Sequence, residues 1–117
     1  MQRFGIGEKE MGLARLLWQY EEISSGAVVK LCKEEFNWAK STTYTMLRRV
    51  QEHGLFKNEK SMVTPVMTEA EYLARVAGEM IDDKFDGSLA QFVKHALMVK
   101  KLSAAEKADL LSIVNMK

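Results

Sequence analysis

The chain has 117 residues, a length that suits one compact domain, or one small domain with an appendage, and excludes a multidomain enzyme. Its composition, with 47% apolar and 28% charged residues, seven glycines and one proline, is that of a folded protein and excludes a disordered one. Seventeen basic residues against 16 acidic ones leave a net charge of +1, so bulk charge gives no sign of a nucleic-acid partner.

Two helices are expected at the start of the chain. Apolar residues from Met11 to Tyr20 recur at spacings of three and four, which indicates an amphipathic helix. A brief strand at Ile23 is expected next. The polar run 24–26 then offers an N-cap to a second, short helix over residues 27–35.

The third expected helix carries the most informative pattern. It should begin near Ser41 and end at Gly54, because glycine accepts the left-handed conformation that follows many helices. One stripe at helical spacing should face the core and consists of Thr43, Met46, Leu47 and Val50. The opposite face is polar and long-armed and consists of Ser41, Thr42, Tyr44, Thr45, Arg48 and Arg49. A solvated helix face is the plain interpretation of such a stripe.

The elements after Gly54 favour DNA binding instead. Residues 55–57 and 61–63 flank Asn58-Glu59-Lys60, which predicts two short strands joined by a tight turn. Helix, strand stub, helix, helix and hairpin is the order of a winged helix-turn-helix, whose third helix enters the major groove. Arginine can bind guanine in a bidentate manner, and threonine offers a hydroxyl and a methyl group to base edges.

The only proline, Pro65, marks a boundary, because a helix is disfavoured before proline. We expect a winged-helix DNA-binding domain over residues 1–66 and a helical dimerisation region over residues 67–117. Ten basic residues face eight acidic ones before Pro65, and seven face eight after it, which gives +2 and −1. Any nucleic-acid binding therefore belongs to the first domain.

The second region has three helix starts with capping boxes, formed by Thr68 with Glu71, Ser88 with Gln91, and Ser103 with Glu106. About fifty residues in three helices bury too little surface to be stable alone, so we expect them to pack against a second copy. The residues expected at this dimer contact are Tyr72, Val76, Met80, Phe92, Leu97, Leu102, Leu110, Leu111 and Val114. The fold class is then mainly α with a small β-hairpin.

Catalysis, metal binding and membrane insertion find no support in the sequence. Cys32 and two distant histidines, His53 and His95, fit no zinc spacing. A nucleophile, a base and an orienting group cannot be assembled, so we expect no enzyme and no cofactor. Since no apolar run approaches the roughly 18 residues of a membrane span, and no signal peptide is visible, we expect a cytoplasmic protein.

Several short segments, in this order and at these spacings, match the sequence pattern of a known protein family. They are Leu16-Leu17-Trp18, Trp38, Ser41-Thr42, Thr45-Met46-Leu47, Arg49, His53-Gly54-Leu55, Thr64-Pro65, Thr68-Glu69-Ala70-Glu71-Tyr72, Phe85-Asp86-Gly87-Ser88-Leu89 and Leu102-Ser103-Ala104-Ala105-Glu106. With them, nearly the whole chain resembles the penicillinase-repressor family of bacterial winged-helix regulators, which includes methicillin-resistance and copper-responsive repressors.

The resemblance implies a homodimeric transcriptional repressor that binds double-stranded DNA at a palindromic operator of a resistance or stress operon. The positions that contact DNA in the family correspond to Lys40, Ser41, Thr42, Tyr44, Thr45, Arg48 and Arg49, with Lys57 and Lys60 beside the wing. The wing departs from the family pattern, because it is shorter and lacks arginine. Gly7 stands where a Ser or Thr cap is usual, and Met11 where tryptophan is usual.

Two alternatives concern regulation and function. Beta-lactam-responsive members of the family are cleaved at an Asn-Phe bond, which this chain lacks, so either its switch differs or a regulatory protease as partner cuts another bond. Copper-responsive members bind copper through Cys-x-Cys pairs, and the single Cys32 argues against that mechanism. The near-neutral charge and short wing also leave open a winged-helix protein-interaction module that binds DNA weakly and without sequence preference.

Overall fold

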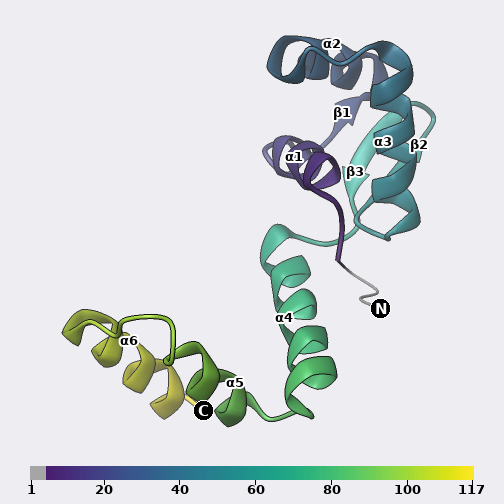
Figure 1. The fold of residues 1–117 in the computed structure, drawn as a ribbon. Coiled ribbons are helices and arrows are strands. Elements are labelled where there is room, and N and C mark those ends of the chain that lie inside the picture. Colours follow the sequence, from purple (N-terminus) through teal and green to yellow (C-terminus); the bar gives the residue numbers. More distant parts are fainter. Residues whose placement is uncertain (1–4) are drawn as a thin grey trace. The chain divides into compact units, whose positions relative to one another are not determined.

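A computed structural model describes residues 5–117 (Figure 1). Within them the elements follow in the order α1 (Glu8–Leu17), β1 (Ile23–Ser24), α2 (Ser25–Phe36), α3 (Lys40–Glu52), β2 (Phe56–Glu59), β3 (Met62–Pro65), α4 (Glu69–Phe85), α5 (Leu89–Ala96) and α6 (Ala104–Asn115). The fold is mainly α with a small antiparallel sheet in the strand order β1-β3-β2, as the sequence predicts. The chain divides into two compact units, the first ending at Glu79 and the second covering Met80–Lys117.

The first three helices begin and end close to their expected positions. Helix α1 starts three residues before the expected Met11, because Gly7 is its N-cap and the Glu10 carboxylate accepts a hydrogen bond from the Gly7 N–H at 3.4 Å. Helix α2 is capped by Ser24, whose hydroxyl accepts from the Ala27 N–H at 3.1 Å. Helix α3 ends before Gly54, which has a φ of +79°.

The turn of the hairpin lies two residues further on than predicted, so that prediction is wrong in detail. Asn58 and Glu59 are paired with β3 instead of forming the turn. Lys60 and Ser61 form it, with φ of 52° and 63°. A two-residue turn with both φ positive matches the right-handed twist of the strands, and this gain outweighs the strain of left-handed backbone at two residues that are neither glycine nor asparagine.

The first part of α4 packs on the winged helix. Tyr72 is only 4% exposed within the core of the first unit, and Val76 packs against the same core. The Trp18 indole N–H donates to the Met67 carbonyl at 2.9 Å, and its ring lies 5.7 Å from the Tyr72 ring. The first compact unit therefore extends to Glu79, beyond the boundary expected at residue 66.

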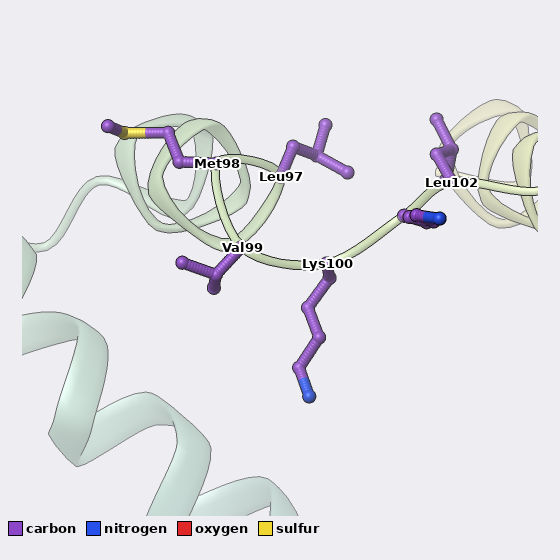
Figure 2. A pocket seen from close by; sticks show the side chains of 6 residues that line it. Leu97, Met98, Val99, Lys100 and Leu102 are labelled. Atoms are coloured by element: carbon purple, nitrogen blue, oxygen red, sulfur yellow. The ribbon is translucent and has the colours of Figure 1, made fainter.

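The three helix starts of the second region are capped by the predicted residues, Thr68 with a complete capping box and Ser88 and Ser103 with the hydroxyl half of one. Thr68 and Glu71 exchange two hydrogen bonds of 3.1 and 3.0 Å. Ser88 and Ser103 each accept one backbone N–H at 3.1 Å. Helices α5 and α6 contain no buried residue, and a pocket of about 660 Å³ opens along the connection from Leu97 to Leu102 (Figure 2). The second unit thus exposes much of its apolar surface.

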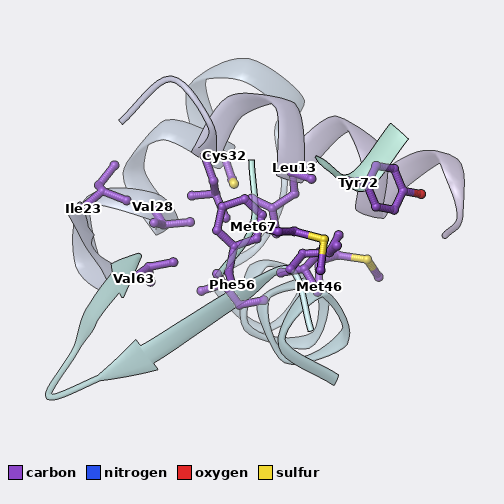
Figure 3. Packing of buried hydrophobic residues seen from close by; sticks show 14 residues of the cluster. Leu13, Ile23, Val28, Cys32, Met46, Phe56, Val63, Met67 and Tyr72 are labelled. Carbon is purple, nitrogen blue, oxygen red and sulfur yellow. The ribbon is translucent and has the colours of Figure 1, made fainter. Parts of the chain in front are cut away.

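The core of the first unit fixes the orientation of α3. Its predicted inner stripe is buried and consists of Thr43, Met46, Leu47 and Val50. Met46, Leu47 and Val50 pack in one cluster with side chains from α1, α2 and the sheet, among them Leu13, Val28 and Val63 (Figure 3). Because this stripe is held inward, the opposite side of α3 is turned away from the core.

Candidate nucleic-acid interface

The outer face of α3 consists of Ser41, Thr42, Tyr44, Thr45 and Arg48. Ser41, Tyr44 and Arg48 are exposed, and the two threonines are partly exposed. Ser41, Thr45 and Arg48 follow one another at spacings of four and three, so they share one line along the helix. The face is thus polar, continuous and accessible, which is what contact with base edges requires.

Local contacts arrange the first turns of this face. The Thr45 hydroxyl donates to the Ser41 carbonyl at 3.0 Å, so it can still accept a hydrogen bond and present its methyl group. The Lys40 ammonium lies 5.9 Å from the centre of the Tyr44 ring. No side chain caps the helix start at Ala39, so its first backbone N–H groups are available to an anion.

The two neighbouring arginines of α3 have different surroundings. Arg48 is exposed and makes no ion pair within residues 5–117. The Arg49 guanidinium, by contrast, donates to the Glu10 carboxylate of α1 at 3.4 Å. The Arg49 guanidinium is therefore held toward α1, although Arg49 follows Thr45 at a spacing of four and its side chain is still 52% exposed.

The wing carries two lysines, of which one is paired with a glutamate. Lys60 is exposed at the tip of the hairpin. The Lys57 ammonium lies 3.3 Å from the Glu59 carboxylate, and both side chains are exposed. An exposed pair of this kind is weak and can be broken by a competing phosphate, but it lowers the net positive charge of the wing.

One residue of this region cannot be recognised from the sequence pattern. Glu10 is 8% exposed, and besides Arg49 its carboxylate lies 3.6 Å from the His53 ring nitrogen. His53, the C-cap of α3, follows Arg49 by four residues, so the two side chains lie on the same side of that helix. The spacing of Gly7 and Glu10 is that of a capping box, but glycine at the cap hides the usual signal.

The remaining candidate groups do not form a chemical site in the described part of the chain. Cys32 is buried, and the loss of solvation raises the pKa of its thiol. No group of three metal-ligating side chains occurs in residues 5–117. No helix in that range is long and apolar enough to cross a membrane.

Comparisons with known proteins agree with this geometry. The chain is 24% identical to the penicillinase repressor of Bacillus licheniformis over 113 residues, which cover 93% of this chain and 88% of that repressor. It is also similar to the solution structure of the DNA-binding domain of the repressor BlaI, with a TM-score of 0.53, 25% identity, and coverage of 57% of this chain and 87% of that domain. Since the model of the penicillinase repressor family matches residues 6–116, the chain belongs to this family of transcriptional repressors, which are not enzymes.

Proposed function

We propose that this DNA-binding repressor acts as a homodimer on a palindromic operator, in the cytoplasm, where it controls a resistance or stress operon. The observation that carries the proposal is the outer face of α3, which is exposed and polar while the inner stripe is fully used by the core. A helix of this kind fits the major groove, and two such helices, about one DNA turn apart, would read the two halves of a palindrome.

The outer face of α3 has the chemistry for base contacts. Arg48 is exposed and can form a bidentate contact with guanine. Ser41 and Thr45 offer hydroxyl oxygens on the same line. Tyr44 and Thr42 lie at the margins of this face, where they would contact the sugar-phosphate backbone or the thymine methyl group.

Backbone contacts would come from the ends of this surface. Lys40 lies at the uncapped start of α3, where the helix dipole also favours a phosphate. Lys60 at the wing tip, and Lys57 once released from Glu59, would contact a second phosphate. With two or three phosphates neutralised per subunit, the logarithm of the affinity should fall against the logarithm of salt with a slope of roughly −4 to −5.

The second unit supports a dimer because its helices and the connection between α5 and α6 leave large apolar side chains exposed. Val99 is 83% exposed and Val114 is 67% exposed, and an apolar groove of about 210 Å³ runs between α5 and α6. A second copy is the occupant we propose, since a symmetric interface would cover the same surface on both chains. The proposed contact residues are Met80, Phe92, Leu97, Leu102, Leu110, Leu111 and Val114, without Tyr72 and Val76, which pack in the first unit.

The test is a footprint of the purified protein on the DNA upstream of its own gene, across a salt series and with nonspecific competitor. We expect a protected palindrome whose affinity falls steeply with salt. Uniform weak binding at low salt without any footprint there or on a pool of genomic fragments would favour a protein-interaction module instead. A gene for a membrane sensor protease beside this one would support a regulatory protease as a further partner.

A further inference from the structure

A buried carboxylate connects the first helix of the winged helix with the proposed DNA-reading helix. Glu10 in the first turn of α1 is 8% exposed, and its two oxygens are shared among three groups. One lies 3.4 Å from the Arg49 guanidinium, and the other lies 3.4 Å from the Gly7 N–H and 3.6 Å from the His53 ring nitrogen. The contacts thus join the start of α1 to the last turns of α3.

Such a carboxylate must be compensated by its neighbours, because a buried charge without a partner is costly. Arg49 is the group that can do this permanently, since arginine stays protonated. An arginine that contacts phosphate would instead have to leave Glu10 buried and without its cation. Arg49 therefore cannot compensate Glu10 and contact a DNA phosphate at the same time.

We propose that Arg49 is a positioning residue, held by Glu10, which sets the rotation of α3 against α1 and so places the outer face of α3 on DNA. The proposal rests on the proposed function, and it removes Arg49 from the residues that neutralise phosphate. Rotation matters because a side-chain envelope about 10 to 12 Å wide moves by about 1 Å at its edge when the helix turns by about 10°. A shift of about 1 Å exceeds the range of good hydrogen-bond distances, so a small rotation is enough to lose a base contact.

The sharpest variant is Glu10→Gln. Glutamine keeps an oxygen for the Gly7 N–H, as capping boxes allow, and removes the charge that faces Arg49 and His53. If Arg49 positions α3, operator affinity should fall about tenfold, the size expected from losing one hydrogen bond to a charged group, with the salt slope unchanged. If Arg49 is a phosphate contact, Glu10→Gln frees it, so affinity should rise and the slope should steepen.

Arg49→Ala completes the comparison. On the positioning model, Arg49→Ala lowers operator affinity by a similar factor. The double variant with Glu10→Gln and Arg49→Ala then binds no more weakly than either single variant, and Arg49→Lys restores part of the affinity. On the phosphate model it makes the slope shallower by about 0.9 for each subunit, on operator and on random duplex alike. Arg48→Ala is the comparison for a direct DNA contact, because the Arg48 guanidinium makes no bond to Glu10.

The two proposals fail in different ways. If the unmodified protein gives no footprint on any DNA, the proposed operator function fails, and the slope on random duplex still decides the role of Arg49. A shallower slope for Arg49→Ala there overturns the positioning role. The positioning role is supported if the salt slope of Arg49→Ala is unchanged and the α3 amides of Glu10→Gln exchange hydrogen faster. Unchanged hydrogen exchange in Glu10→Gln contradicts that role. If Glu10→Gln does not fold, Arg49→Lys and Arg49→Ala provide the same two readouts.

Discussion

Substitution of Val114 by aspartate tests whether the second unit forms the proposed dimer. This side chain belongs to α6 and is 67% exposed in the single chain. If a second copy covers it, Val114→Asp places a charge where apolar surface should be removed from water. The dimer should then dissociate at concentrations at which the unmodified protein is fully associated.

The magnitude follows from the exposed fraction. Complete burial of a valine side chain stabilises by about 1.5 to 3 kcal/mol, and about two-thirds of the Val114 surface remains to be covered. A symmetric dimer contains two copies, so the loss amounts to roughly 2 to 4 kcal/mol, before the cost of desolvating aspartate is added. The dissociation constant should therefore rise by about 30-fold or more.

Sedimentation velocity over a concentration series measures this change, and circular dichroism checks that the helices persist. The chain offers a matched control in Val66→Asp, because Val66 is 57% exposed but belongs to the first unit. We expect the control to dimerise like the unmodified protein. Equal association by Val114→Asp would remove α6 from the interface, and selective dissociation by Val66→Asp would move the interface to the first unit.

Three further predictions concern DNA contact and stability. Arg48→Ala should weaken operator binding by about 1 to 3 kcal/mol and leave binding to random duplex nearly unchanged, as measured by competition titration, and equal losses on both would exclude a base contact. Lys60→Gln should make the salt slope of the dimer shallower by about 1.8, and an unchanged slope would mean that the wing does not contact DNA. Glu71→Gln should make stability less sensitive to acid: hydrogen bonds from Thr68 hold the Glu71 pKa below its ordinary 4.5, so this contribution is full above that pH and is lost as pH falls through the folded pKa. Thermal unfolding at pH 7 and in acid checks it, and equal acid sensitivity of variant and unmodified protein would contradict it.

The helices of the first unit could be predicted from sequence because their signals are local. The inner stripe of α3 is buried at the positions that helical spacing gives, from Thr43 to Val50. The starts of the later helices could be predicted from Ser88 and Ser103. The hydroxyl of each serine accepts a hydrogen bond from the backbone N–H three residues later. Periodicity and capping depend on neighbours within about one or two helical turns, so a single sequence contains them.

The turn of the wing could not be predicted in the same way. Turn prediction from residue type looks for glycine or asparagine where φ is positive, and Asn58 satisfies this rule. In the structure Asn58 is paired with Val63, and the left-handed positions are occupied by Lys60 and Ser61. The pairing of β2 with β3 decides the turn, and it is a property of two strands together rather than of the turn residues.

The contacts of Arg49 and Tyr72 with distant parts of the chain could not be predicted from sequence patterns. Arg49 looks like one more cation on the outer stripe of α3 until Glu10, 39 residues earlier, is found beside it. Tyr72 likewise has helical spacing with the proposed dimer residues, but Trp18 and Met67 draw it into the first unit. In both cases helical periodicity predicts on which side of its own helix the residue lies. It does not predict which other element of the fold packs against that side. The direction of Arg49 fits contact with DNA or with α1 equally well, so only the placement of α1 beside it assigns this arginine to Glu10, while contact of Arg48 with DNA stays a prediction.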